Sequence, residues 1–244
     1  MQPAPDLCVL VWNSEWARPD SQRGRMIREV LRSPDPDLIC LTEGYEEILP
    51  ETGHIITSEP DYGYKLFRGR RKVLLWSREP WRSVDVVGSK DLPTGRFVGG
   101  VTCTSLGDIG IVGVCIPWKD AHVRTGKRNR AAWEDHCSYL RTLPLVLDEC
   151  DTRERFLLAG DWNQRIPPTA RVPAMARELL THALDRLTIT TAGPVNPHGN
   201  QVIDHLTCSP DLIAVSRETL PCEDGTGRPL SDHVGVVVRL RSDV

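Results

Sequence analysis

The sequence predicts a layered α/β sandwich, and two features support this prediction. Near the start of the chain, short apolar runs flank a segment of helical spacing, which is typical of parallel strands joined by a crossover helix. In the middle, extended runs follow one another with Gly and charged turns and no helical pattern, which indicates antiparallel strands. Parallel and antiparallel pairs together give mixed sheets, with amphipathic helices packed outside them.

Length and composition narrow the alternatives. The chain has 244 residues, of which 40% are hydrophobic, so we expect one sizeable core and a single domain over 1–244. The net charge of −3 argues against a protein that coats nucleic acid through bulk positive charge, but it leaves room for a local basic groove. No apolar run reaches about 18 residues and no signal-peptide pattern is present, so we expect a cytoplasmic monomer without a membrane span.

The eight cysteines are expected to be free thiols. Five of them lie inside apolar, strand-like runs and show no CxxC spacing, which favours buried thiols over disulfides. These five are Cys8, Cys40, Cys103, Cys115 and Cys208.

The predicted elements of the first half follow in order. The stretch from Leu7 to Trp12 forms a buried strand, residues 22–33 form a helix that Pro34 ends, and residues 37–42 form the next strand. The extended runs that follow span residues 62–67, 72–77, 83–88, 96–105 and 110–118.

The second half begins with a long helix from Arg128 to Cys150, which Pro144 is expected to kink. A strand over residues 155–163 and a short helix from Ala174 to Ala183 come next. The remaining predicted strands span residues 201–209, 211–216 and 234–240.

Polar side chains gather where the apolar runs end. Taken singly, most of them have a structural explanation as a turn former, a solvated charge or a structural histidine. Because the ends of strands that share a sheet edge line one crevice, we expect these side chains to converge. They are Asn13, Glu43, Asp161 with Asn163, Asp204, and Asp232 with His233.

Part of this set suits a hard divalent cation. Mg²⁺ prefers oxygen ligands and keeps several waters, so one or two carboxylates suffice to hold it. Glu43 and Asp232 are the candidate ligands, with Asn13 as a neutral helper. The sequence therefore predicts a Mg²⁺ site, at which Mn²⁺ is an acceptable substitute.

The other members suit the hydrolysis of a phosphoester. Asp161, held by Asn163, is expected to orient and deprotonate the attacking water. An imidazolium at His233 would donate to the phosphoryl oxygens. Asp204 lies in an apolar strand, where an unpaired carboxylate costs several kcal/mol, so it needs a partner and is expected to hold His233 and raise its pKa.

Two other kinds of site are disfavoured. Ser231, Asp232 and His233 cannot form a serine-hydrolase relay, because adjacent residues of an extended segment point to opposite sides. His136 and Cys137 are adjacent too, and no second ligand pair with metal spacing accompanies them, which weakens a zinc site.

These motifs resemble the endonuclease/exonuclease/phosphatase superfamily, and they occur in the order of that family. They are VWN at Asn13, LICLTE at Glu43, LLAGDWN at Asp161 and Asn163, VIDH at Asp204, and LSDH at Asp232 and His233. The resemblance implies a four-layer α-β-β-α sandwich with two mixed sheets packed face to face and a metal-dependent site at one rim. It also implies a phosphoester substrate, which is nucleic acid, an inositol phosphate, a sphingolipid head group or a smaller molecule in different members.

One position departs from the family pattern. Many members carry a His or Tyr that contacts the phosphate where this chain has Cys115, a poor phosphate donor. Trp118, Lys119 or His122 could replace it, although a solvated turn explains each of them too.

The basic segments bear on the substrate. Residues 65–72 and 119–130 are rich in Lys and Arg. We expect His122, Arg128 and Arg130 of the second segment, together with Trp118 just before it, to bind the substrate. These segments favour a nuclease. The acidic net charge and the interval of only about 40 residues between Asn163 and Asp204 favour a small phosphoester instead. A binding module without activity is disfavoured, because burying so many carboxylates is costly without a cation.

Overall fold

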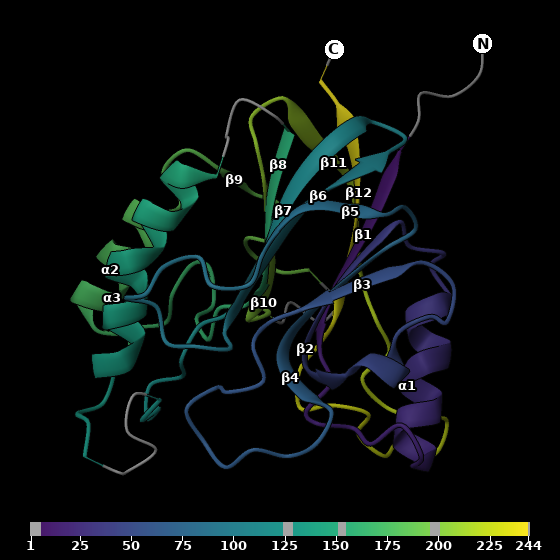
Figure 1. Ribbon diagram of the computed structural model, residues 1–244, viewed down its shortest axis with the longest axis horizontal. Coiled ribbons are helices and arrows are strands. Elements are labelled where there is room, and N and C mark those ends of the chain that lie inside the picture. The colour runs from purple at the N-terminus through teal and green to yellow at the C-terminus, as the bar shows by residue number, and fades with distance from the viewer. Residues whose placement is uncertain (1–5, 124–128, 151–154, 196–200, 244) are drawn as a thin grey trace.

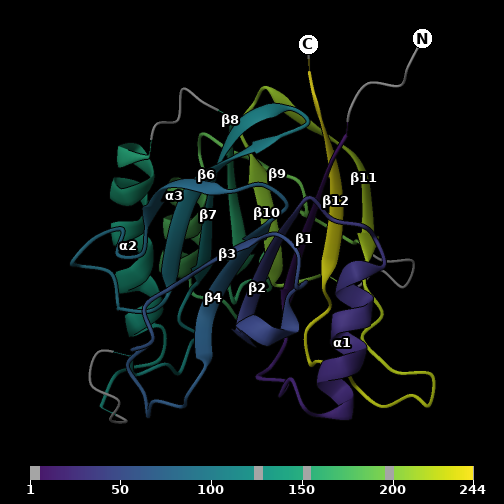
Figure 2. The same ribbon diagram turned by 45° about the vertical axis from the view of Figure 1, so that its right-hand side comes forward.

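The computed structural model describes residues 6–123, 129–150, 155–195 and 201–243. Within these residues, two six-stranded sheets pack face to face. One helix covers the outer face of the first sheet, and two helices lie together over the outer face of the second (Figure 1). The turned view in Figure 2 shows the same succession of layers. The architecture is therefore the predicted four-layer α-β-β-α sandwich with mixed sheets.

The first sheet has the strand order β11-β12-β1-β2-β4-β3. Its strands β1 and β2 pair in parallel, and the helix α1 connects them, as the spacing of the N-terminal segment predicts. The pairs on either side of them are antiparallel. The bounds are β1 Leu7–Asn13, α1 Gln22–Arg32, β2 Leu38–Tyr45, the short 3-10 helix η1 Glu46–Ile48, β3 His54–Thr57, β4 Arg70–Ser77, β11 Leu212–Thr219 and β12 Val236–Ser242.

The second sheet has the strand order β5-β6-β7-β8-β10-β9. It repeats the plan of the first, because β7 and β8 pair in parallel and the helix α2 lies between them in the chain. The bounds are β5 Trp81–Asp85, β6 Phe97–Thr104, β7 Gly107–Cys115, α2 Glu134–Glu149, β8 Arg155–Asp161, α3 Ala174–Ala183, β9 Thr188–Ile189 and β10 Asp204–Cys208.

Three apolar layers hold the sandwich together. The central layer lies between the sheets and is formed by side chains such as Val9, Val73 and Ile111. In the outer layers, α1 packs Ile27 against the first sheet, and α2 packs Tyr139 against the second. Because all five side chains are fully or almost fully buried, we attribute most of the stability to these layers.

The structure corrects several local predictions. Residues 62–67 are not a strand, because Gly63 has a left-handed backbone with φ of +83° and the following side chains are exposed. The short strands β3 and β9 were not predicted, and the extended runs of the middle are divided between the two sheets. The helix α2 begins at Glu134 rather than Arg128, because Trp133 just before it also has a left-handed backbone.

One thiol prediction was also wrong. Cys103 is exposed, because neighbouring residues of a strand face opposite sides and Thr102 takes the buried side. The other four strand cysteines are buried, and all eight are free.

The two parallel pairs position the polar strand ends. Asn13 ends β1, Glu43 lies in the last half of β2, Cys115 ends β7 and Asp161 ends β8. Carboxyl ends of parallel neighbours meet at one edge, and the two sheets face each other, so these four residues approach one rim of the sandwich.

Candidate active site

A pocket of about 270 Å³ opens at this rim. Six of the residues predicted from the sequence line it, and four further residues join them. The lining comprises Glu15, Glu43, Lys72, Arg96, Cys115, Trp118, Asp161, Asn163, Asp232 and His233. Two more predicted residues, Asn13 and Asp204, contact the lining residues by hydrogen bonds.

Asp161 is held from two sides at the end of β8. Its Oδ1 accepts a hydrogen bond from the backbone N–H of Asn163 at 2.9 Å, and its Oδ2 accepts one from Asn13 Nδ2 at 3.1 Å. The side chain is buried, and burial together with the charge of Asp204 raises the pKa of Asp161 to about 7. A carboxylate with this pKa is poised to accept a proton near neutral pH.

The backbone around Asp161 explains the Gly-Asp-Trp-Asn sequence. Gly160 has φ of +138°, and a Cβ at this position would lie 1.9 Å from the carbonyl oxygen of Val114 on β7, so only glycine fits. Asn163 has a left-handed backbone with φ of +54°, and its Nδ2 donates to the carbonyl of Ile116 at 2.9 Å. These contacts fasten the turn to β7 and fix the carboxylate at its place.

His233 and Asp204 form the predicted pair. His233 Nδ1 donates to Asp204 Oδ2 at 2.7 Å, and Asp204 is fully buried opposite Asp161 in the β8–β10 register. Burial by itself lowers the pKa of His233, but the carboxylate of Asp204 outweighs it and raises the pKa to about 10. The imidazole is therefore a cation at neutral pH, and its Nε2 lies 3.8 Å from Asp232 Oδ1 at the exposed side of the pocket.

Glu43 adopts an uncommon conformation. Its φ of +50° is rare for a residue other than glycine, and such backbone strain is often found at functional sites. Ser14 Oγ and the Trp16 N–H donate to its carbonyl oxygen at 2.9 and 2.7 Å, which holds the strained backbone. The carboxylate accepts a hydrogen bond from Lys72 Nζ on the neighbouring strand β4.

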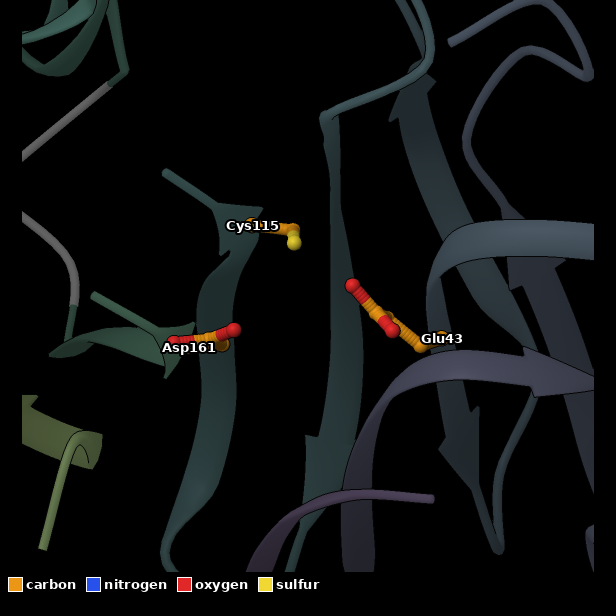
Figure 3. A group of neighbouring side chains, drawn as sticks. All are labelled: Glu43, Cys115 and Asp161. Atoms are coloured by element: carbon orange, nitrogen blue, oxygen red, sulfur yellow. The ribbon is translucent and has the colours of Figure 1, made fainter. Parts of the chain in front are cut away.

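The donor set fits a divalent cation. Figure 3 shows the side chains of Glu43, Cys115 and Asp161 pointing toward one another across the space between the strands. One ligand atom from each lies within 4.8 Å of the other two, and Asp161 forms a second such group with Asp204 and His233. Among the described residues, Asp204 Oδ1 is buried without a hydrogen-bond partner, so this carboxylate has one oxygen free to interact with a cation.

Two of the predicted metal ligands, Asn13 and Asp232, lie outside the compact group of Glu43, Cys115 and Asp161. Asn13 Oδ1 accepts the backbone N–H of Glu15 at 2.8 Å, so the whole amide is used in positioning Asp161, and its metal contact stays a prediction. Asp232 has a side chain that is 67% exposed and borders the pocket. Its role as a ligand also stays a prediction.

The predicted substrate-binding residues separate into two groups. Trp118 lines the pocket and is half exposed. His122 and Arg130 are not among the lining residues, and Arg130 Nε is instead bonded to buried Asp135 at 3.1 Å while its backbone N–H donates to His122 Nδ1 at 3.0 Å. These contacts fasten the segment before α2, so the geometry does not support substrate binding by this pair. Arg128 lies outside the described residues.

The sequence missed two cations of the pocket. Lys72 was assigned only to a basic segment, although it reaches Glu43, and Arg96 was not singled out. Arg96 is 2% exposed, its Nη1 donates to the carbonyl of Cys115 at 3.1 Å, and its Nε has no partner among the described residues. No motif marks either residue, because Lys72 lies inside β4 and Arg96 lies in the turn before β6, and neither follows an apolar run.

Comparison with known proteins identifies the family of the chain. The model of the Endonuclease/Exonuclease/phosphatase family matches residues 10–233. The chain belongs to this family. The match therefore spans both parallel pairs and ends at His233. A search of curated proteins gave no match.

Solved structures of the family share the fold. An endonuclease/exonuclease/phosphatase from Beutenbergia cavernae is 22% identical, with a TM-score of 0.70 over 97% of this chain and 72% of that chain. The 3′ phosphatase NExo from Neisseria, bound to a product DNA hairpin, is 17% identical, with a TM-score of 0.71 over 98% and 100% of the two chains. An AP endonuclease from Archaeoglobus fulgidus is 18% identical, with a TM-score of 0.66 and the same coverage.

Membership of this family supports metal-dependent hydrolysis of phosphoesters, in agreement with the chemistry predicted from the motifs. The metal-ligating groups described above are compatible with a divalent cation. In the described part of the chain, no helix combines the length and apolar character needed to cross a membrane.

Proposed function

We propose that this protein is a Mg²⁺-dependent phosphodiesterase, and specifically a nuclease. The observation that carries the proposal is the convergence of Asp161 and the His233–Asp204 pair in one pocket with Glu43. A poised proton acceptor, an imidazolium and an acidic cation site are the groups that phosphodiester hydrolysis by water requires. Manganese is compatible with the same oxygen donors.

Each residue has a role that follows from its contacts. Glu43, with the predicted ligand Asp232, would hold the cation, which would polarise the phosphoryl group when bound. Asp161 takes a proton from the attacking water as the new bond to phosphorus forms, and the bond to the leaving oxygen breaks with its electron pair staying on that oxygen, which takes a proton from solvent. The imidazolium of His233 donates to a phosphoryl oxygen that gains charge, while Asp204 keeps the ring protonated and oriented.

Lys72 and Arg96 give the pocket its positive side. Both line the pocket and are largely buried, and Arg96 Nε lacks a partner among the described residues. An ammonium group and a guanidinium that line a pocket are suited to an anionic substrate. We therefore assign to these two residues the phosphate contacts that the family His or Tyr makes where this chain has Cys115.

An exposed segment beside the pocket favours nucleic acid. Tyr64, Leu66 and Phe67 are exposed, and basic Lys65 and Arg68 alternate with them. Aromatic side chains combined with cations provide stacking surfaces for bases and contacts for the phosphate backbone. Trp118 at the pocket rim would add a further ring. Of the similar structures, one is described as an AP endonuclease and another as a 3′ phosphatase bound to a product DNA hairpin.

This segment adjoins the pocket through specific contacts. Tyr64 Oη accepts the backbone N–H of His122 at 2.8 Å, and Tyr62 stacks on Trp16 with ring centroids 5.5 Å apart. Lys72 Nζ lies 5.1 Å from the centroid of the Trp16 ring. A nucleic-acid strand bound along this segment would therefore pass close to the basic side chains of the pocket.

A small or lipid head-group phosphoester is the second candidate. A pocket of about 270 Å³ accommodates a phosphate with a small substituent, and the net charge of −3 does not attract a polyanion. This candidate uses the same catalytic groups and differs only in the role of the exposed segment.

The test is a substrate panel run with Mg²⁺ and with chelator. The panel contains single-stranded DNA, double-stranded DNA, RNA and an aryl phosphodiester. We expect metal-dependent cleavage of a nucleic acid, and a loss of about 10³-fold or more in turnover for Asp161→Asn. The matched control is Asp185→Asn, which changes an exposed aspartate beyond α3.

The outcomes separate the candidates. Turnover of the aryl phosphodiester without cleavage of any nucleic acid would favour the small-molecule alternative. Equal activity of Asp161→Asn and wild type would refute the proposed site. We expect the melting temperature of Asp161→Asn to equal or exceed that of wild type, because the raised pKa shows that burying the ionised carboxylate is unfavourable. We also propose that residues 1–244 form a single domain and that the protein acts as a cytoplasmic monomer.

A further inference from the structure

Cys115 places a thiol among the carboxylates of the active site. Its Sγ and one carboxylate oxygen each of Glu43 and Asp161 all lie within 4.8 Å of one another, and the three residues come from the strands β7, β2 and β8 (Figure 3). The side chains project from separate, hydrogen-bonded strands, so the sheets hold this arrangement in place.

A thiolate changes which cations such a site prefers. Carboxylates and water suit Mg²⁺, whereas thiolate ligands select softer cations such as Zn²⁺ and Cd²⁺. Zinc accepts sulfur and oxygen ligands together, at about 2.3 Å and 2.0–2.2 Å, in a tetrahedral arrangement. Three protein ligands leave a fourth position for water. Modest movement of the side chains from their present spacing would bring the three donors to these distances.

We propose that Cys115, Glu43 and Asp161 form a binding site for a thiophilic divalent cation such as Zn²⁺, and that its occupation blocks hydrolysis. The thiol proton passes to solvent when the cation binds. The second half of the proposal rests on the proposed function, because the cation would occupy Asp161, the proton acceptor, and Glu43, a ligand of Mg²⁺. The thiol contributes little to binding Mg²⁺, so its loss should weaken the binding of Zn²⁺ and leave the binding of Mg²⁺ almost unchanged.

A second observation supports a cation at this place. Asp204 is fully buried beside Asp161, and its Oδ1 has no hydrogen-bond partner among the described residues. Arg96 Nη1 lies 3.8 Å from Cys115 Sγ and would stabilise the thiolate once it forms. The acidic groups thus attract the cation, and the neighbouring guanidinium favours the charged form of the sulfur ligand.

The test is a titration of the full chain with CdCl₂, followed by the ultraviolet charge-transfer absorption of a cadmium–thiolate bond. The exposed and half-buried cysteines are first changed in a Cys103→Ser, Cys150→Ser, Cys222→Ser background, so that thiols outside the pocket do not contribute. We expect one equivalent of Cd²⁺ to bind in this background with a charge-transfer band. Adding Cys115→Ser should abolish the band and weaken binding by at least about 10-fold.

A persistent band after Cys115→Ser would overturn the assignment. Because Cys115 is buried, Cys115→Ala provides a second variant, and circular dichroism shows which variant is folded. In the same background, Asp161→Asn should keep the band, since the thiol is intact, but bind Cd²⁺ more weakly. An unchanged affinity of Asp161→Asn would place the cation away from the pocket and would also refute the assignment.

Inhibition by ZnCl₂ tests the second half of the proposal. At saturating Mg²⁺, we expect Zn²⁺ to inhibit the background protein at a concentration at least about 10-fold lower than it inhibits the Cys115→Ser variant, each relative to its own activity. Equal inhibition would refute the block. If no phosphoester is hydrolysed while the cadmium band behaves as expected, the cation site stands and the proposed nuclease function fails.

Discussion

Buried histidines in two regions of this molecule differ in charge, one being a cation and two being neutral at pH 7. His233, at the rim between the sheets, has its pKa raised to about 10, whereas burial lowers the pKa of His136 and of His205 to about 4. His136 and His205 lie in the layer between the second sheet and its helices. All three rings are largely withdrawn from water, so burial does not explain the difference.

Hydrogen-bond partners explain it. His136 Nδ1 donates to the carbonyl of Pro117 at 2.7 Å, and its Nε2 accepts from Gln164 Nε2 at 2.8 Å. His205 Nε2 donates to the carbonyl of Gln164 at 2.9 Å, and Thr191 Oγ1 donates to its Nδ1 at 2.8 Å. Each ring has one donor and one acceptor nitrogen, the pattern of a neutral imidazole. Among these three rings, only His233 is bonded to a carboxylate.

The contrast shows how one strand serves both regions. Asp204 and His205 are neighbours in β10, and because side chains alternate along a strand, they point to opposite faces of the sheet. Asp204 meets His233 at the rim, while the ring of His205 packs on Trp162 with centroids 4.7 Å apart. The charged pair of Asp204 with His233 and the neutral contact of His205 with Trp162 therefore arise from adjacent residues of one strand.

The largest expected effect separates activity from stability. His233→Ala should lower turnover by about 10²–10⁴-fold, because the pocket loses its imidazolium. His205→Ala should lower the free energy of unfolding by about 2–4 kcal/mol, because it leaves a cavity beside Trp162 and removes two hydrogen bonds. Steady-state kinetics and urea unfolding measure the two quantities.

Exposed His54 provides the matched control, since His54→Ala should change neither quantity. The comparison fails if His233→Ala unfolds the protein while His205→Ala leaves stability unchanged.

The second effect is an opposite dependence on pH. His205 has a lowered pKa, so its contribution to stability is complete above pH 6.5 and is lost as the pH falls toward 4. His233 has a raised pKa, so its contribution is complete below pH 6.5 and is lost as the pH rises toward 10. The stability advantage of wild type over His205→Gln should therefore shrink on acidification, and its advantage over His233→Gln should shrink on alkalinisation.

The difference in the free energy of unfolding between wild type and each variant should change by about 1.4 kcal/mol per pH unit within the pH range in which that histidine titrates. Differences between wild type and variant are the quantity to measure, by urea unfolding at a series of pH values, because groups distant from the substituted ring titrate alike in both proteins and cancel. Slopes of the same sign for His205→Gln and His233→Gln would show that the two rings do not differ in charge.

The sequence contains much of this arrangement, because local patterns encode it. Apolar runs that end in Asn13 or Asp161 identify strands and their polar ends together, and the short helix from Ala174 to Ala183 was predicted with the bounds that the structure shows. The pairing of Asp204 with His233 followed from the cost of a buried, unpaired carboxylate.

Other features depend on contacts between distant segments and left no local signal. Lys72 reaches Glu43 from the neighbouring strand, and Arg96 approaches Cys115 from the turn just before β6, so neither residue is marked by its own surroundings in the sequence. The basic character of residues 119–130 suggested phosphate contacts, but the charge of Arg130 is bonded to Asp135. The composition of such a segment shows its charge but does not show which residues its basic side chains contact.

The smallest expected effect concerns this last residue. Arg130 bonds Glu134 and Asp135 at the start of α2 and does not line the pocket, so it should behave like the structural histidines. Arg130→Ala should lower the free energy of unfolding by about 1–2 kcal/mol, because buried Asp135 loses a partner and, among the described residues, keeps the backbone N–H of Val123. Arg186→Ala, which removes an exposed ion pair with Asp148, is the control and should cost less than about 1 kcal/mol. Turnover of a nucleic acid should be unaffected by Arg130→Ala, and a tenfold fall in kcat/KM for the polymer, without a fall for an aryl phosphodiester, would restore Arg130 to the substrate-binding surface.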